Sequence, residues 1–510
     1  MSAMKSKGIV YLVGAGPGDA GLLTVRGAEL LARAGVVVYD ALVNKELLCL
    51  APPEAELIDA GKRSSNHAIP QDQLNQLLVD KARAGKCVVR LKGGDPYVFG
   101  RGGEEAEQLA AAGIAFEVVP GVTSSIAGPN YAGIPLTHRE YCSSFTVVTG
   151  HEDPDKEGPE VDWAQVAKAP GTKAILMGVN RVKSISKALI DHGMSSSTPV
   201  AMIRWATTAR QETVVGTLAT IADVADKAGF KPPGLIVIGE VVRLRGKLNW
   251  FEKRPLFGRR IVVTRTRAQA SELTRLLLDR GGDVLEIPTI RILPPTGQQE
   301  IAEALLELNS YDWLVFTSPN GVSAFFDLFF KAFDDLRDIG GARIAAVGPA
   351  TADKLRALHL KVNATPKKFV ASKLAEAMAD DGSLENLKVL LLRAEVANRE
   401  LPKQLEEMGA IVDDVACYKT APETEDRSGA VARLLETGAD WITFTSSSTV
   451  ENFNARIELK TLLARFPMMK LASIGPETSK AIVALGLKPD LEAKDHTIDG
   501  LVKAIESAPT

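Results

Sequence analysis

A glycine-rich loop and an aspartate at the end of a strand are the first residues in this sequence that could do chemistry. Residues 92–103 read KGGDPYVFGRGG, and five glycines are more than a chain reversal needs. Glycine permits positive φ angles and lets a ligand approach the backbone closely. Asp40 ends the apolar stretch VVVYD, where a carboxylate can act as a general base. On spacing alone, capping of the following helix is the commoner role for such an aspartate.

Short apolar strands that alternate with helical patterns must position these residues. Residues 9–19, IVYLVGAGPGD, run from a strand into a glycine turn and then into a helical pattern. A dinucleotide fingerprint would need glycine at position 19, where the sequence has Asp19. The stretches KCVVRLKGGD and FEVVPGVTSS repeat the order of strand, small-residue turn and helix. Such units predict an α/β fold with open parallel sheets, which bind ligands at the carboxyl ends of their strands.

The second half of the chain contains an internal repeat. DWLVFTS at 312–318 matches DWITFTS at 440–446, and RIAAVGPAT at 343–351 matches KLASIGPET at 470–478. The matched blocks keep their order at an offset of 128 or 127 positions. Two copies are too few for a solenoid, so the repeat predicts two similar lobes.

Hydroxyl-bearing turns end the strands of both copies. Serine and threonine at a helix N-terminus cap free N–H groups, and the same groups attract anions. A single turn of this kind is most often a plain helix cap. Matching turns in both lobes favour a shared anion-binding cleft. The candidate anion-binding residues on these turns are Thr351, Ser446, Ser447 and Thr478.

Composition excludes several classes of protein. The chain has 510 residues, 24% of them charged, and a formal net charge of -3, so it has no overall basic field for nucleic acid or an anionic membrane. No run approaches the ~18 apolar residues of a membrane span. The four cysteines form no CxxC pair and the six histidines no pair at helical spacing, so we expect no metal site. These features indicate a cytoplasmic protein.

Pattern changes along the chain predict four lobes and a short basic, aromatic join at 246–258. βα-type units continue beyond residue 144 in the first half. In the second half, two β-rich crossings indicate that one lobe is inserted in the other. The expected lobes are 1–140, 141–249, 258–292 with 418–510 as an outer lobe, and 293–417 as the inserted lobe.

The first half resembles the uroporphyrinogen-III C-methyltransferases of the tetrapyrrole methylase family. The motifs GAGPGD, LLTVRGAELL, VVVYDALV, RLKGGDPYVFGRGGEE, PGVTSS and GIPLTHR carry the resemblance over roughly residues 8–249. It implies a two-lobed fold that holds S-adenosylmethionine between its lobes, a homodimer formed through this half, and two methyl transfers that yield precorrin-2. Implied catalytic residues are Asp40 as base and Lys62 as proton donor. Implied cofactor-binding residues are Pro17, Gly93, Gly94, Asp95, Val98, Thr123, Ser124, Met177 and Ala206.

Several of these assignments have structural alternatives. Asp95 can cap its own turn, and an isolated lysine such as Lys62 is more often solvated or paired with a carboxylate. Ala206 and Ser124 differ from the glycine and alanine common in the family, but both keep a small side chain. Arg90, Lys92, Arg101 and Arg139 are further candidates for pairing with substrate carboxylates.

The second half resembles uroporphyrinogen-III synthase through IVVTRTRA, FTSPNGV, VGPAT, LLRAE, ACYKT, FTSSSTV and IGPETSKA. The resemblance implies two lobes joined by a two-stranded linker, and closure of hydroxymethylbilane into a macrocycle with inversion of the last ring. That reaction releases hydroxide, and Tyr418 is our candidate for the assisting acid. Packing of Tyr418 between elements is the alternative role. No metal or cofactor is implied for this half.

Taken together, the halves predict a bifunctional enzyme in which one half makes uroporphyrinogen III and the other consumes it, toward sirohaem or cobalamin. Two alternatives stay open. The methylase half could act on a later corrinoid intermediate, diphthamide or ribosomal RNA. The second half could be a ligand-binding module without catalysis.

Overall fold

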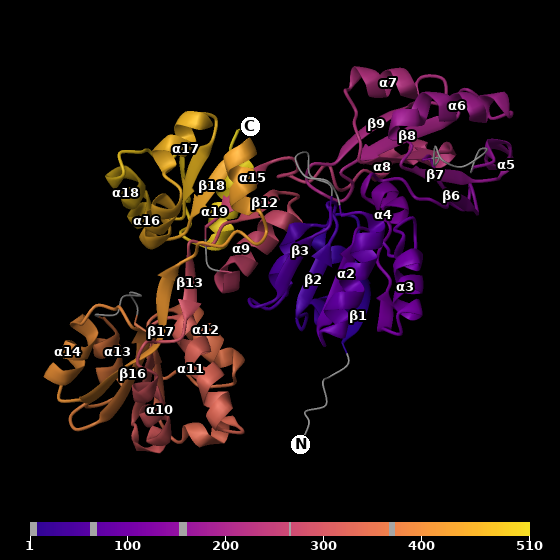
Figure 1. Ribbon diagram of the computed structural model, residues 1–510. Helices are drawn as coiled ribbons and strands as arrows, with labels where there is room; N and C mark the ends of the chain where they lie inside the picture. The colour runs from indigo at the N-terminus through magenta and orange to yellow at the C-terminus, as the bar shows by residue number, and fades with distance from the viewer. Residues whose placement is uncertain (1–7, 62–68, 152–160, 265–266, 367–372, 510) are drawn as a thin grey trace. The chain divides into compact units, whose positions relative to one another are not determined.

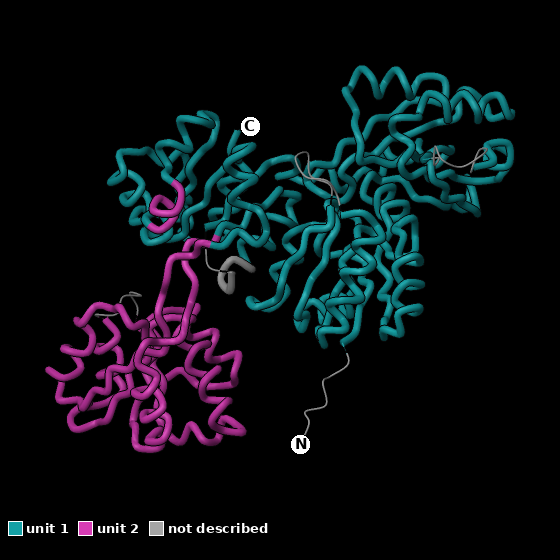
Figure 2. The backbone as a smooth tube through the Cα atoms, viewed as in Figure 1, with its two compact units in different colours: residues 1–287, 425–451, 458–510 teal, residues 288–424, 452–457 magenta. Residues whose placement is uncertain are grey.

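The computed structural model describes residues 8–61, 69–151, 161–264, 267–366 and 373–509 (Figure 1). Within these ranges the strands form four sheets of five strands each. The chain divides into two compact units (Figure 2). The first unit comprises residues 1–287, 425–451 and 458–510, and the second comprises residues 288–424 and 452–457. The first unit contains three of the four sheets, and the second contains the fourth.

The first sheet has the order β3-β2-β4-β1-β5 and is parallel throughout. Its strands are β1 (Ile9–Gly14), β2 (Val36–Tyr39), β3 (Glu56–Asp59), β4 (Cys87–Lys92) and β5 (Ala115–Val119). Its helices are α1 (Val25–Leu31), α2 (Gln71–Arg83) and α3 (Gly102–Ala111), whereas α4 (Ser124–Tyr131), which follows β5, contacts the second sheet. Val10 and Leu12 pack with side chains of α2 and α3, whereas Tyr11 and Val13 pack with those of α1. Because both faces are covered, a ligand can approach the sheet only at the strand ends.

The second sheet, β6-β7-β10-β8-β9, is mixed. Its elements are β6 (Phe145–Thr149), α5 (Trp163–Lys168), β7 (Thr172–Leu176), α6 (Val182–Asp191), β8 (Pro199–Arg204), β9 (Glu212–Thr217), α7 (Ile221–Lys227) and β10 (Gly234–Ile238). β6 runs parallel to β7, but β10 is antiparallel to β7 and β8, and β8 is antiparallel to β9. β6, β7 and β8 thus run in one direction, and β9 and β10 run in the other. The βα pattern expected beyond residue 144 is therefore wrong for β9, which follows β8 without an intervening helix, and for the direction of β10. Buried strands of either direction have similar apolar sequences, so the local pattern did not distinguish them.

The join between the two halves is packed rather than loose. It begins with α8 (Arg245–Leu248). The rings of Trp250 and Phe251 lie 5.1 and 4.8 Å from the ring of Tyr131 at the end of α4. Arg245 forms an ion pair of 2.5 Å with Glu252. The aromatic and basic residues of the predicted join therefore anchor it to the preceding lobe.

The third sheet is β12-β11-β18-β19-β20, and it is parallel throughout. Its strands are β11 (Arg260–Val263), β12 (Asp283–Glu286), β18 (Trp441–Phe444), β19 (Lys470–Ser473) and β20 (Leu491–Glu492). Its helices are α9 (Arg267–Asp279), α15 (Ala430–Thr437), α16 (Ser447–Arg456), α17 (Leu459–Arg465), α18 (Pro476–Ala484) and α19 (Ile498–Ser507). This sheet forms the outer lobe of the second half.

The fourth sheet, β13-β17-β16-β14-β15, forms the inserted lobe and is parallel except for β13. Its strands are β13 (Ile290–Leu293), β14 (Trp313–Phe316), β15 (Arg343–Ala346), β16 (Lys388–Ala394) and β17 (Ile411–Pro422). Its helices are α10 (Gln298–Leu306), α11 (Pro319–Ala332), α12 (Pro349–Ala357), α13 (Leu374–Ala379) and α14 (Glu400–Glu407). A phenylalanine-rich face of α11 fills the core beneath β14.

The two copies of the internal repeat form sheets with the same strand order. The outer lobe places β12, β11, β18 and β19 side by side, and the inserted lobe places β17, β16, β14 and β15 in the same succession. Each strand of one series matches the strand at the same place in the other, so the prediction of two similar lobes, one inserted in the other, is confirmed.

Candidate functional site

Three backbone turns meet at the carboxyl ends of β1, β4 and β5. The N–H of Gly16 donates to the carbonyl of Gly94 at 3.2 Å, and the N–H of Gly94 donates back at 2.8 Å. A Cβ atom added to Gly121 would lie 2.2 Å from the carbonyl oxygen of Gly94. Only glycine permits this approach. The predicted cofactor residues on these turns are Pro17, Gly93, Gly94, Asp95, Thr123 and Ser124.

Asp95 ties two of the turns together. Its Oδ1 accepts from the N–H of Tyr97 at 2.8 Å, and its Oδ2 accepts from the N–H of Gly121 at 3.0 Å. Asp95 therefore caps its own turn, which is the structural role considered for it as an alternative. Its contact with a cofactor stays a prediction. Val98 follows in the same loop and is exposed.

The turn at Gly93 has open space beside it. A Cβ atom built on Gly93 meets only the Cβ of Leu42, at 3.7 Å, and one built on Gly94 lies 3.7 Å from the Cα of Thr123. Leu42 is itself exposed, as are Tyr97 and Phe99 in the loop that follows Gly94. A ligand with an apolar surface can therefore reach the backbone here.

A loop of the second sheet completes this region. The N–H of Asp19 donates to Oγ1 of Thr207 at 3.0 Å. A Cβ atom on Gly18 would lie 3.0 Å from the carbonyl oxygen of Ala206. Ala206 therefore lies beside the turn that holds Pro17, although the two residues are far apart in the sequence.

Met177 follows β7 and has a positive φ of 55°, as Trp205 and Thr207 have at 47° and 68°. Side chains other than glycine rarely adopt this conformation, and where it occurs it often marks a ligand site. Met177 is exposed. Its position as a cofactor residue stays a prediction.

Asp40 lies immediately after β2 and is held by Arg90 of the neighbouring strand. The Nη2 atom of Arg90 lies 2.5 Å from Oδ1 of Asp40. The side chain of Asp40 is 34% exposed, whereas that of Arg90 is 3% exposed. Asp40 therefore has a fixed carboxylate with one accessible side, as a general base needs. Lys62, the predicted proton donor, lies outside the described residues.

The structure overturns the suggestion that Arg90 and Lys92 pair with substrate carboxylates. Both side chains are buried and contact Glu105 of α3. Sequence reasoning missed Glu105, although a signal was present. Glu105 shares the buried face of α3 with Ala106 and Leu109, whereas the preceding Glu104 is exposed and pairs with Arg101.

In the inserted lobe, Tyr418 is buried within the hydrophobic cluster. Its hydroxyl lies 2.9 Å from Oγ of Ser318, which caps α11 by accepting from the N–H of Gly321 at 3.1 Å. Burial raises the pKa of Tyr418, and the bond to Ser318 opposes that shift. Thr351 lies in the first turn of α12 and is also buried.

In the outer lobe, three predicted residues meet at the ends of β18 and β19. Oγ of Ser446 accepts from the N–H of Thr449 at 3.3 Å and caps α16. Oγ of Ser447 donates to the carbonyl of Glu477 at 3.0 Å, which links the two turns. Thr478 follows and is 3% exposed. The backbone of these turns is thus more available to an anion than the Thr478 hydroxyl is.

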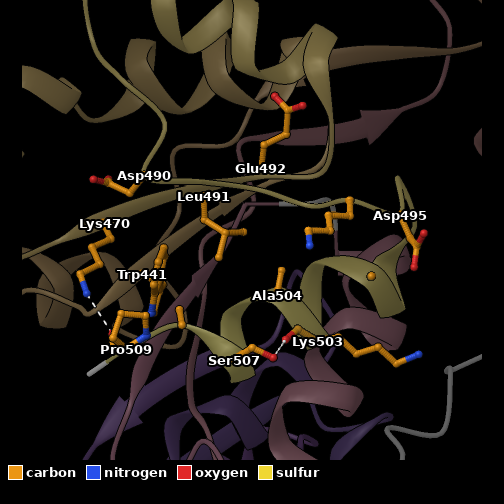
Figure 3. Close-up of a pocket in the computed structure, with 13 residues that line it drawn as sticks. Trp441, Lys470, Asp490, Leu491, Glu492, Asp495, Lys503, Ala504, Ser507 and Pro509 are labelled. Atoms are coloured by element: carbon orange, nitrogen blue, oxygen red, sulfur yellow. Dashed lines mark hydrogen bonds between the residues drawn. The ribbon is translucent and has the colours of Figure 1, made fainter.

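A cavity of about 620 Å³ lies at the opposite end of the same sheet (Figure 3). Trp441 and Lys470, the first residues of β18 and β19, line it together with residues of α19. Nζ of Lys470 donates to the carbonyl of Pro509 at 3.1 Å. None of the predicted site residues lines this cavity.

Among the described residues, no group of three His, Cys, Asp or Glu side chains is placed to hold a metal ion. In the same part of the chain, every helix is too short or too polar to cross a membrane.

Known proteins match both halves. Residues 9–222 match the family model of Tetrapyrrole (Corrin/Porphyrin) Methylases, and residues 271–503 match that of Uroporphyrinogen-III synthase HemD. The Porphyrin biosynthesis protein HemD of Ruminiclostridium josui is 38% identical over 500 residues, which cover 97% of each chain. The chain belongs to this HemD family. It is a fusion of a methylase half and a synthase half, as the sequence predicted, and the α/β fold class is confirmed.

The methylase half has relatives of its own. An S-adenosyl-L-methionine-dependent uroporphyrinogen III methyltransferase of Methanosarcina barkeri is 54% identical over 242 residues, 48% of this chain and 95% of that protein. The crystal structure of the Thermus thermophilus uroporphyrin-III C-methyl transferase with S-adenyl homocysteine is 42% identical. It covers 46% of this chain and 94% of that one, with a TM-score of 0.40. The cofactor expected from the sequence is the one named for the M. barkeri relative.

Proposed function

We propose that the synthase half closes hydroxymethylbilane to uroporphyrinogen III and that the methylase half converts this product to precorrin-2, on the route to sirohaem or cobalamin. The observation that carries the proposal is the meeting of three glycine turns beside the anchored Asp40, in a chain related over its whole length to a HemD protein. The synthase makes the substrate that the methylase needs.

The residues around the glycine turns fit S-adenosylmethionine. The open backbone at Gly93 and Gly94 would hold the cofactor, with Pro17, Thr123 and Ala206 on the adjoining turns. Asp95 would act chiefly by fixing the turn, because both of its oxygens already accept backbone hydrogen bonds. When bound, the cofactor supplies a methyl group on a positively charged sulfur.

The chain's own task in methyl transfer is to align the substrate and to take up a proton. A pyrrole carbon that gains a methyl cation carries no proton of its own, so the macrocycle must lose one proton from another position to leave a neutral product. Asp40 accepts this proton on its accessible side while Arg90 holds the other oxygen. Each of the two methylations releases one proton in this way.

In the synthase half, ring closure requires the loss of hydroxide from the bilane. Tyr418 donates a proton to the leaving oxygen, which departs as water. Ser446 and Ser447, with the backbone N–H groups of their turns, hold substrate carboxylates, and Thr351 and Thr478 do so through their helix N-termini. Alignment of a flexible polyanion supplies most of the rate enhancement.

The decisive experiment supplies hydroxymethylbilane and S-adenosylmethionine to the intact chain. We expect a dimethylated type III product. Formation of only the uninverted ring by residues 258–510 would show that the second half binds without catalysis. Supplied uroporphyrinogen III that stays unmethylated would reject the methylase assignment.

We also propose a homodimer through the methylase half, which light scattering of the purified chain would test, and a cytoplasmic location. The lobe limits 1–140, 141–249, 258–292 with 418–510, and 293–417 belong to the same proposal. A truncated chain ending at residue 249 that folds and binds S-adenosylmethionine would support the first division.

A further inference from the structure

Four charged side chains cluster where β2 and β4 end. Nε of Arg90 and Nζ of Lys92 both contact Oε1 of Glu105, at 3.2 and 2.8 Å. The other end of the Arg90 guanidinium donates to Oδ1 of Asp40 at 2.5 Å. A continuous line of contacts therefore connects Lys92, Glu105, Arg90 and Asp40.

Only one member of the cluster reaches the surface. The side chains of Arg90, Lys92 and Glu105 are 3%, 2% and 0% exposed, whereas that of Asp40 is 34% exposed. Burial lowers the pKa of Lys92, and the neighbouring Arg90 lowers it further. Charges in such a dry setting interact strongly and are little screened by salt.

Within the described residues, Glu105 is the buried carboxylate that these two cations share. Its Oε1 accepts from both and lies 3.4 Å from Nε2 of Gln71, while its Oε2 has no hydrogen-bond partner. An unpartnered buried carboxylate oxygen is costly. Glu105 is thus buried at a cost in folding free energy while it contacts two cations, which indicates a role for its charge.

We propose that Glu105 is a positioning residue for methyl transfer: it neutralises one of two buried cations, so that Arg90 orients Asp40 without holding its carboxylate too tightly to accept a proton. This inference rests on the proposed role of Asp40 as proton acceptor. With Asp40 ionised and Lys92 protonated, the cluster has two positive and two negative charges.

The charge balance also explains how Asp40 could serve twice in one reaction sequence. A proton that moves from the methylated macrocycle to the free oxygen of Asp40 leaves the cluster with one excess positive charge. The excess charge drives that proton on to water at the exposed side of Asp40. The carboxylate is then restored before the second methyl transfer.

The competing explanation is that Glu105 only fastens α3 to the sheet. The variant Glu105→Gln, and a double variant built on it, separate a role of the Glu105 charge from a role in anchoring α3. In Glu105→Gln, two buried cations face Asp40 alone, and we expect kcat for methylation of supplied uroporphyrinogen III to fall by about tenfold or more. The KM for S-adenosylmethionine should stay within about twofold of the parent value.

Adding Lys92→Met to Glu105→Gln removes the second cation and restores one positive charge opposite Asp40. We expect this double variant to recover most of the lost kcat. An anchoring role predicts the opposite, because two buried contacts are then gone. A double variant as slow as Glu105→Gln, or slower, would overturn the proposal.

Three further variants complete the test. Glu104→Gln changes the exposed neighbour in the same helical turn and should leave kcat unchanged. Glu105→Asp keeps the charge and should retain more activity than Glu105→Gln. If Glu105→Gln fails to fold, Glu105→Asp can still be compared with the parent chain. If both variants fold and lose the same amount of kcat, the explanation by charge is overturned. If Asp40→Asn is inactive while Glu105→Gln is fully active, only this inference fails; an active Asp40→Asn rejects the proposed base itself.

Discussion

The hydroxyl group of Tyr418 lies 2.9 Å from Oγ of Ser318, and the same Oγ accepts a hydrogen bond from the N–H of Gly321 in the first turn of α11. Tyr418 of β17 and the Gly321 N–H of α11 thus share one hydrogen-bond partner, Ser318, which lies 100 positions before Tyr418 in the chain. A tyrosine phenol carries its proton at neutral pH, and burial, which raises the pKa of Tyr418, favours that same state. A proton donor to departing hydroxide needs this state.

Replacing Tyr418 with phenylalanine tests that role. We expect kcat for closure of hydroxymethylbilane to fall by about tenfold to a hundredfold, the scale of losing a general acid. Methylation of supplied uroporphyrinogen III should be unchanged, because Tyr418 belongs to the synthase half. The measurement is the ratio of enzymatic type III to spontaneous type I product.

Tyr311 offers a matched control in the same lobe. It is also buried, and its hydroxyl donates to Asp413 at 2.7 Å. Tyr311→Phe should lower stability by about 1 kcal/mol through the lost hydrogen bond, without slowing ring closure. Equal activity of the Tyr418→Phe and Tyr311→Phe variants would assign Tyr418 to packing alone.

Two glycines of the methylase half should respond in opposite ways to alanine. A Cβ atom on Gly93 has no neighbour closer than 3.7 Å, so Gly93→Ala should fold with normal stability and bind S-adenosylmethionine more weakly. A Cβ atom on Gly121 would lie 2.2 Å from a backbone oxygen, so Gly121→Ala should lower the thermal unfolding midpoint. Calorimetric titration and thermal unfolding measure the two effects. Normal cofactor affinity in Gly93→Ala would place the cofactor elsewhere.

Glu46 predicts a pH-dependent stability. It lies in η2 (Lys45–Leu50), and burial raises its pKa to about 7. The charges of Glu286 and Asp283 add to the shift, whereas the charge of Arg433 and a hydrogen bond with Asn44 oppose it. Because the pKa of Glu46 is higher in the folded chain, protonation of this side chain favours folding. That contribution to the free energy of unfolding is complete below about pH 4.5, the ordinary pKa of glutamate, and is lost as the pH rises through about 7.

The variant Glu46→Gln removes this titration. We expect it to be more stable than the parent chain at pH 8 and to lose that advantage at pH 5. Thermal unfolding of both proteins at the two pH values provides the measurement. An equal difference at both pH values would show that Glu46 does not titrate in this range.

Arg427 binds the backbone that follows Glu46. Its guanidinium donates to the carbonyls of Ala51, Pro52 and Pro53, at 3.2, 3.1 and 2.5 Å. Arg427→Ala should destabilise the chain by about 1.5–3 kcal/mol, the range for hydrogen bonds to a charged group. Faster amide exchange of residues 54–56 should accompany the loss. Arg337→Ala, which alters an exposed arginine, serves as the control.

Much of the fold was predictable because the relevant patterns are local. Apolar strands followed by small-residue turns indicated the parallel sheets, and the offset of 128 positions indicated two similar lobes, which the structure shows to share one strand order. The prediction failed at β9 and β10 for the same reason, since the direction of a strand depends on its partners, which a local pattern does not specify.

The sequence by itself determined which residue types lie at the strand ends and therefore which turns could bind a ligand. The tertiary structure decided which side chains meet: Arg90 with Asp40, both cations of β4 with Glu105, and Tyr418 with Ser318. These partners are 13 to 100 positions apart in the chain. Local periodicity sets the face on which a side chain lies, but the order of strands in the sheet sets its neighbours.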